Sequence, residues 1–315
     1  MSGGPEVPVG SRARVAAEGA RAATLGALSR QPTKVVAANR AFRWFLYAAI
    51  GVALVGLIAL LVDAFVEGQA RLSFSLITDS TSRIADQAGF RQAILGSLWL
   101  IGLMILMVVP LGVGAAIYME EYANRESRLN RLIEVNIQNL AAVPAIVYGI
   151  LGLAFIVRGP IDLGFMLLAG SMTLALLVLP TVIIAAREAI RAVPPSIREG
   201  SLALGATEWQ TTRHQVLPAA LPGILTGLIL AVSRALGEAA PLLLFGAAIF
   251  VTTDPQPLNA DAGWTALPVQ IFSLAADPQA ELRELAAAGI IIMLAVLLLM
   301  NSFAIWLRNR YEQRW

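Results

Sequence analysis

Two charged residues, Arg234 and Glu238, stand within an otherwise apolar segment of the chain. A charge at the centre of a bilayer costs about 2.5–3.5 kcal/mol on insertion scales, so such residues need a site lined by protein or water. Their four-residue spacing predicts that both side chains lie on one helix face. The planar, always charged guanidinium of Arg234 suits an oxyanion such as phosphate, and Glu238 is expected to accept a hydrogen bond from a protonated one. The pair predicts an oxyanion path, with a structural ion pair as the alternative.

A second patterned segment, residues 198–218, is polar and lies between two apolar segments. Ser196 is expected to cap a short helix, with Glu199 completing a capping box. Gly205 permits a backbone conformation closed to other residues, so two short helices can meet there at an angle. The segment therefore predicts a rigid docking element for a cytoplasmic partner, and a solvated amphipathic loop is the alternative. The pattern is carried by Glu199, Gly200, Ser201, Gly205, Leu217 and Pro218.

Several kinds of chemistry are excluded by composition. The chain has no cysteine and a single histidine, His214, and its carboxylates do not cluster as a metal site would require. Its only lysine, Lys34, is not in a GxxxxGK[ST] phosphate loop. We therefore expect no catalytic residue, no metal and no cofactor in this chain, and any ATP hydrolysis must take place on a partner.

The elements that position these residues are membrane helices. The chain is 57% hydrophobic and only 14% charged, whereas soluble domains carry about 25% charged residues, and several apolar runs are long enough to cross a bilayer. We predict an all-α, polytopic membrane protein, with a basic, disordered cytoplasmic tail at 1–40 and one membrane domain at 41–315. The six predicted spans are residues 44–62, 94–118, 140–157, 163–186, 221–251 and 285–307.

The distribution of positive charge predicts the orientation. Most of the 23 Lys and Arg residues fall in the N-terminal tail, in residues 119–137 and 187–217, and at the C-terminus. Short loops rich in Lys and Arg remain on the cytoplasmic side. Both termini and the patterned segment are therefore expected in the cytoplasm. The small net charge of +2 gives no reason to expect nucleic acid as a partner.

The patterned segment resembles the coupling loop of ABC-importer permeases, in which E-A-A is followed at fixed spacing by G, I and L-P. Here Gly-Ser replaces Ala-Ala, and Gln215 stands in place of Ile. Further segments resemble the phosphate-specific permeases of the PstA/PstC type, and the GE-x-APLL form favours PstA. These segments are residues 93–123, which end in a Tyr-x-x-Glu-Tyr signature at Tyr118, Glu121 and Tyr122, and residues 139–154, 198–210, 233–246 and 267–278.

The resemblance implies a type I ABC permease in the bacterial inner membrane. It implies a second permease subunit of the PstC type, two PstB-type ATPases that bind Mg-ATP, and a periplasmic phosphate-binding protein. It places Arg234 on the anion path and Glu238 at the acidic position after it. Residues 187–218 are hereafter the coupling loop. Glu120, Glu121 and Arg125 are interpreted as charges that solvate a loop rather than as ATPase contacts, and His214 as an ordinary surface histidine.

Three rival functions remain. An ABC permease for another oxyanion, such as molybdate or sulfate, is disfavoured by the Arg/Glu pair. A proton-coupled secondary transporter would use Arg234 and Glu238 as a relay, but it should show inverted repeats, and none is visible. An intramembrane enzyme would need a nucleophile–base pair, which the composition does not supply.

Overall fold

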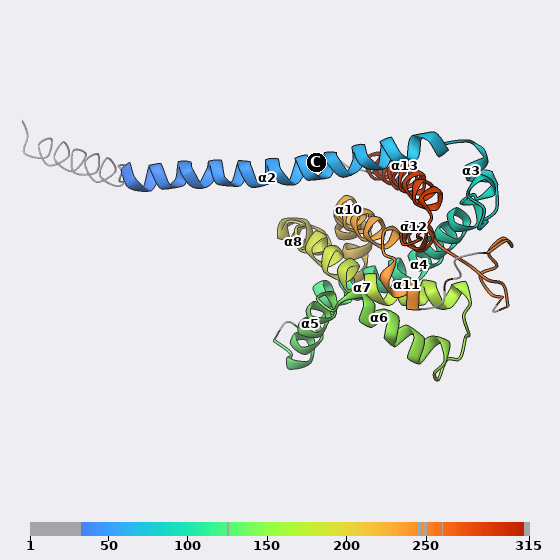
Figure 1. The fold of residues 1–315 in the computed structure, drawn as a ribbon. Helices are drawn as coiled ribbons and strands as arrows, with labels where there is room; N and C mark the ends of the chain where they lie inside the picture. The colour runs from blue at the N-terminus through green and yellow to red at the C-terminus, as the bar shows by residue number, and fades with distance from the viewer. Residues whose placement is uncertain (1–32, 125, 245–246, 248–250, 260, 312–315) are drawn as a thin grey trace, which may run out of the picture. The chain divides into compact units, whose positions relative to one another are not determined.

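The computed structural model describes residues 33–311 except 125, 245–246, 248–250 and 260. The described residues form helices and connecting segments with no β-strand, which confirms the predicted all-α class (Figure 1). The chain divides into two compact units, Met1–Val62 and Asp63–Trp315.

The first unit holds most of α2 (Thr33–Gly68), a helix that contains the first predicted span. Residues 38–71, which extend three residues beyond the end of α2, form a segment long and apolar enough to cross a membrane. Helix α2 begins inside the segment 1–40 that was predicted to be a disordered tail, and the rest of that tail, residues 1–32, lies outside the described residues.

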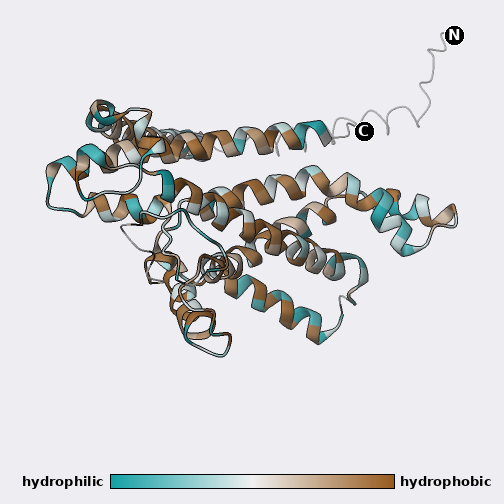
Figure 2. Ribbon diagram, turned by 90° about the vertical axis from the view of Figure 1, so that its right-hand side faces the viewer, coloured by the Kyte–Doolittle hydropathy of each residue, from teal (hydrophilic) through white to brown (hydrophobic). Residues whose placement is uncertain are grey.

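The second unit is built on four long helices: α4 (Arg91–Ile117), α7 (Leu167–Arg191), α10 (Leu217–Leu236) and α13 (Ala280–Tyr311). Helix α4 packs along α7, α7 along α10, and α10 against α13. Figure 2 shows hydrophobic colour along the long helices and hydrophilic colour mainly at their ends and in the loops. The apolar core between α4, α7 and α10 includes Leu100, Met104, Leu174, Val178 and Ala235.

Shorter elements connect these helices. On the side opposite the coupling loop, the buried side chain of Gln92 accepts a hydrogen bond from the Thr81 amide and donates to the Thr252 carbonyl, which ties two loops to α4. The shorter elements outside the coupling loop are η1 (Gln69–Arg71), α3 (Ser75–Thr78), η2 (Ala85–Gln87), the π-helix η3 (Tyr118–Tyr122), α5 (Arg128–Ala141), α6 (Ala145–Gly152), the π-helix η4 (Leu153–Val157), α11 (Ala240–Leu244) and α12 (Leu267–Ala275).

The predicted second, fourth and sixth spans are confirmed as α4, α7 and α13. The predicted third span is a bent pair, in which α5 and the α6–η4 segment meet at 101°. Pro144 stands at the bend, where it is the N-cap of α6, and the residue before a proline is disfavoured in helical conformation. Among the described residues, five helices can cross a membrane, or six spans result if the bent pair is one.

The fifth span begins and ends earlier than predicted, since the helical segment that can cross a membrane covers residues 208–236. Helix α10 ends at Leu236, and Glu238 and Ala239 are not helical before α11 begins. Gly237 forms the C-cap, and Pro241 has no backbone N–H with which to continue the hydrogen-bond ladder. The prediction of one continuous helix over residues 221–251 is therefore wrong at the break between α10 and α11, and residues 245–246 and 248–250 lie outside the described residues.

Small residues hold α7 against α10 below the coupling loop. A Cβ added to Gly223 would lie 2.8 Å from the Cβ of Ala189, and one added to Gly227 would lie 2.4 Å from the Cβ of Ala185. Such close approach between small residues is a principal source of helix association in membranes. The α7–α10 pair is therefore a stiff base for the coupling loop.

Replacing Gly227 with alanine is expected to destabilise the protein. The added methyl group has no free space beside Ala185, and overpacking of this kind costs about 1–3 kcal/mol. Thermal unfolding of the purified protein measures the effect. Gly102→Ala in α4 is the matched control, because no atom lies within 4 Å of its added Cβ. Equal unfolding temperatures for the two variants would contradict the close-packing account.

Candidate coupling and translocation site

The coupling loop folds into two short helices, as its sequence predicts. It contains α8 (Pro195–Ala203), α9 (Glu208–Thr211) and the π-helix η5 (Thr212–Val216), which continues directly into α10. Gly205, between α8 and α9, has a φ of +88°, in the left-handed region that disfavours residues with a Cβ. The predicted conformation of Gly205 is therefore confirmed.

The predicted cap at Ser196 is wrong. Helix α8 begins two residues earlier than such a cap requires, with Pro194 at the N-cap and Pro195 in its first turn. Proline at this position needs no cap for its missing N–H, and its fixed φ already suits a helix. A capping box is present instead at α9, where the backbone N–H of Gln210 donates to Thr207 Oγ1 and the backbone N–H of Thr207 donates to the side-chain Oε1 of Gln210. The sequence Thr-Glu-Trp-Gln carries the signature of this box.

The predicted coupling residues divide into an outer and an inner set. Glu199 and Gly200 are exposed on α8. The hydroxyl groups of Ser201 and Thr211 lie 2.9 Å apart and join α8 to the end of α9. Leu217 packs against the buried cluster between the ends of α4, α7 and α10, and Pro218 follows it at the start of α10. The inner set is Ser201, Leu217 and Pro218, and it fixes the loop internally and to the membrane helices. The outer set is Glu199 and Gly200, which are exposed and can contact a partner.

The outer surface of the loop also carries large apolar side chains. Leu202, Leu204 and Trp209 are exposed, and Leu204 reaches 91% exposure. Glu199 and Glu208 are exposed on the same two helices. Exposed apolar groups that are rimmed by polar ones mark protein interaction sites. The loop therefore presents a surface suited to another protein.

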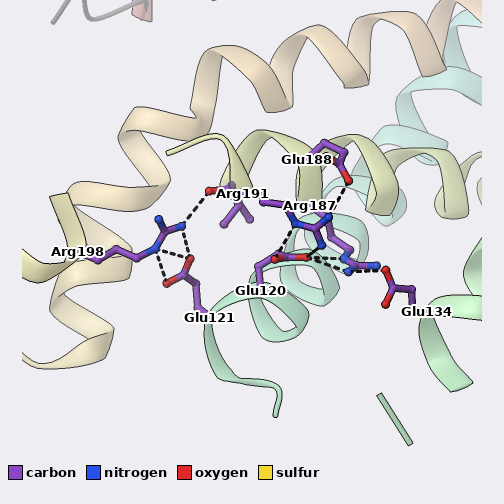
Figure 3. Close-up of polar contacts among 8 residues, drawn as sticks. Glu120, Glu121, Glu134, Arg187, Glu188, Arg191 and Arg198 are labelled. Carbon is purple, nitrogen blue, oxygen red and sulfur yellow. Dashed lines mark hydrogen bonds and ion pairs between the residues drawn. The ribbon is translucent and has the colours of Figure 1, made fainter. Parts of the chain in front are cut away.

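A buried ionic cluster lies at the inner side of the loop. The side chain of Glu120, on η3 at the end of α4, is only 2% exposed, and its carboxylate lies 2.9 Å from Arg187 and 2.8 Å from Arg191 of α7. Arg187, 9% exposed, also lies 3.1 Å from Glu134 of α5. Figure 3 shows these side chains converging on Glu120. The cluster joins the ends of α4 and α7 to the middle of α5.

A second ion pair links the same segment to the coupling loop. Arg198 of α8 donates to both oxygens of the Glu121 carboxylate, at 2.8–3.3 Å (Figure 3). Its two terminal nitrogens also donate to the backbone carbonyls of Val193 and Ile190, at 2.7 and 2.9 Å. The Ile190 carbonyl belongs to the last turn of α7, where helical hydrogen bonds run out, and Val193 lies two residues beyond the end of that helix. Arg198 thus caps α7 and holds η3 with one side chain.

The interpretation of Glu120 and Glu121 as mere loop-solvating charges is therefore wrong, while Arg125 lies outside the described residues. The sequence offered one signal that could have found this cluster. Arg187 and Arg191 stand four residues apart, hence on one helix face, at the end of an apolar helix. Two arginines on a face that packs against another helix require acidic partners nearby.

Arg234 lies in the last turn of α10, beside a small cavity of about 10 Å³. The cavity is also lined by Val178 and Thr181 of α7 and by Tyr148 of α6. Val178 and Thr181 stand near the middle of α7, so α10 ends about halfway along α7 rather than at its tip. Arg234 is exposed on the single chain. Its guanidinium therefore opens toward the surroundings at the mid-depth of the helix pair.

Arg234 and Glu238 do not share a helix face, because the helix ends between them at Leu236. That prediction is wrong for the reason given above for the fifth span. No hydrogen bond or ion pair joins the two side chains among the described residues, and neither has another charged partner there. Interrupted backbone at membrane depth is tolerated only where it is buried in protein or lines a water-filled cavity. The break between α10 and α11 therefore combines an uncompensated guanidinium with interrupted backbone.

The chain is similar to membrane proteins of known transport systems. Residues 108–314 match the family described as binding-protein-dependent transport system inner membrane component. A probable ABC transporter permease protein, YqgI of Bacillus subtilis, is 34% identical over 82% of this chain and 90% of its own length. The phosphate transport system permease protein PstA of Haemophilus influenzae is 33% identical over 82% of this chain and 89% of its own length.

Solved structures show the same fold at low identity. A chain of a bacterial alginate ABC transporter matches with a TM-score of 0.62 at 18% identity, covering 85% of this chain and 94% of that chain. A chain of the MetNI methionine ABC transporter matches with a TM-score of 0.54 at 16% identity, covering 70% and 94%. The family match extends over most of the chain, and the relatives are matched over most of their length. The chain therefore belongs to the family of binding-protein-dependent transport system inner membrane components.

Proposed function

We propose that this chain is the PstA-type membrane subunit of an ATP-driven phosphate importer. The observation that carries the proposal is the break after α10, where Arg234 stands without a charged partner at mid-depth beside interrupted backbone. A guanidinium attracts an oxyanion and offers it two parallel hydrogen bonds. The similarity to PstA of Haemophilus influenzae supports phosphate as that oxyanion.

Glu238 follows Arg234 on the other side of the helix break and is half-buried. A carboxylate there repels a fully ionised anion but accepts a hydrogen bond from a protonated one. Phosphate at neutral pH carries one or two protons, whereas sulfate carries none. The two residues together therefore favour phosphate over sulfate.

The outer surface of the coupling loop is the proposed docking site for a partner ATPase, which binds and hydrolyses Mg-ATP. Glu199 and Gly200 belong to this surface, and Gly205 fixes the angle between its two helices. Ser201, Leu217 and Pro218 transmit the movement of the loop to α9 and α10. The positive-inside distribution of Lys and Arg supports a cytoplasmic location for the loop and both termini in a multi-pass inner-membrane protein.

The remaining partners follow from the architecture of the family. We propose that a second permease subunit of the PstC type completes the path beside Arg234, that two PstB-type ATPases bind the coupling loops, and that a periplasmic phosphate-binding protein delivers substrate. Complementation tests this assignment. Cells that lack their own phosphate permease should regain uptake only when this chain is expressed with all of these partners, and uptake by this chain alone would contradict it.

Replacing Gly205 with valine is expected to reduce ATP-driven uptake about tenfold or more, because a β-branched residue strongly disfavours the left-handed conformation. Nothing lies within 4 Å of an added Cβ at this position, so the effect comes from the backbone rather than from a clash. Gly114→Ala is the matched control, because no atom lies within 4 Å of its added Cβ either and it lies within α4, outside the coupling loop. Uptake is measured alongside the amount of inserted protein. Normal uptake by Gly205→Val would count against the coupling role.

A further inference from the structure

We propose that the η3 segment, Tyr118–Tyr122, is a second receiving point for motion of the coupling loop. Arg198–Glu121 is the contact that transmits the motion, and the Glu120 cluster is the fixed point about which the end of α4 turns. This inference rests on the proposed function, since it requires a partner that moves the loop. It adds a route into α4 that is separate from the direct continuation of the loop into α10.

The first support is the position of Arg198 within α8. Its neighbour Glu199 is exposed on the outer surface, whereas Arg198 points inward to Glu121 and to the last carbonyls of α7. A displacement of α8 therefore pulls on η3 and on the end of α7 through one side chain. Because its guanidinium is planar and bonds both carboxylate oxygens, the contact constrains direction as well as distance.

The second support is the difference in burial between the two ionic contacts. The side chains of Arg198 and Glu121 are 24% and 11% exposed, whereas Glu120 is 2% exposed and Arg187 is 9% exposed. Water reaches the outer pair and can replace its hydrogen bonds during a movement. Breaking the inner cluster would instead leave buried charges without partners, which is strongly unfavourable. The Arg198–Glu121 contact can therefore break and re-form during a movement, whereas the contacts of the Glu120 cluster stay intact.

The third support is the backbone of η3 itself. The segment is a π-helix at the end of α4, followed by Ala123 in extended conformation. Single π-turns are uncommon and occur frequently at functional sites, where they interrupt the regular helix. Helix α4 packs along α7, and the middle of α7 lines the cavity beside Arg234. A shift at Glu121 therefore has a continuous path of packed helices toward the site proposed for the anion.

The test is Glu121→Gln in the complete complex, with Glu188→Gln as the matched control. Glu188 also pairs with an arginine near the end of α7, Arg191, but it is 65% exposed, and no hydrogen bond or ion pair links it to α8 among the described residues. Glu121→Gln is expected to lower phosphate imported per ATP hydrolysed about tenfold, with an unfolding temperature close to that of the unchanged protein. Glu188→Gln is expected to keep the unchanged ratio. A normal ratio in Glu121→Gln would overturn the proposal.

A second readout does not depend on phosphate. The chain has no cysteine, so Tyr122→Cys, at an exposed position, accepts a single fluorescent label at the end of η3. Addition of ATP to the docked complex should change the label's emission, and Glu121→Gln should abolish this change while the ATPase remains bound. An ATP-dependent change that persists in Glu121→Gln would contradict transmission through this pair. Loss of the change together with loss of the fold would assign the pair a structural role only, which also overturns the proposal.

Discussion

Arg234→Gln is expected to reduce ATP-driven phosphate uptake about 100-fold, because a hydrogen bond to a charged group contributes about 1.5–3 kcal/mol and glutamine supplies neither the charge nor the second parallel donor. The side chain has no charged partner among the described residues, so its removal leaves no other group unpaired. Insertion and thermal stability should therefore remain unchanged. The initial rate of labelled phosphate uptake into vesicles measures the effect.

Arg283→Gln is the matched control for this variant, because Arg283 is exposed at the start of α13 and far in sequence from the break after α10. Its uptake should equal that of the unchanged protein. Glu238→Gln separates binding from selectivity, since it should weaken the discrimination against sulfate. Wild-type uptake by Arg234→Gln would show that the anion path does not pass the break after α10. Unchanged discrimination between phosphate and sulfate in Glu238→Gln would contradict the proposed role of Glu238 in selectivity.

The second large effect concerns stability. Glu120→Ala is expected to destabilise the protein by about 3–5 kcal/mol, because removal of one partner from a buried ion pair leaves the other charge uncompensated. Here that charge is Arg187, whose side chain is only 9% exposed and which keeps only the partly exposed Glu134 as a charged partner. Thermal unfolding of the purified protein, followed by tryptophan fluorescence, measures the change.

Glu126→Ala is its control, because Glu126 lies only six residues further along, between η3 and α5, and is exposed. Surface substitutions of this kind usually change stability by about 0.5 kcal/mol or less. The unfolding temperature of Glu120→Ala should therefore fall clearly below that of Glu126→Ala. If the two variants unfold at the same temperature, the buried cluster does not stabilise the fold.

The sequence predicted the long helices because their signal is local. An apolar run of sufficient length has to satisfy its backbone within the helix in a membrane, whatever its neighbours are. The ends and breaks depend on more than composition. The bend at Pro144 and the end of α10 at Gly237 occur within continuous apolar sequence, where hydropathy alone gives no boundary. Both have a proline or glycine signal that favours a break without requiring one.

The candidate site was predictable only in part. The spacing of the coupling-loop pattern and the need for glycine at position 205 are visible in the sequence, and the structure confirms the left-handed backbone there. The pairing of Glu120 with Arg187 joins residues that are 67 positions apart, and only the packing of α4 on α7 brings them together. For the same reason, the sequence could not show that α10 ends opposite the middle of α7.

The central claim is that this chain forms part of an ATP-driven path for phosphate. Its most direct test is uptake of labelled phosphate into vesicles that contain the chain with its partner permease, ATPase and binding protein, with ATP present or absent and with excess unlabelled sulfate as competitor. We predict uptake that requires ATP and is not blocked by sulfate. Uptake driven by a proton gradient without ATP, or uptake abolished by sulfate, would contradict the account.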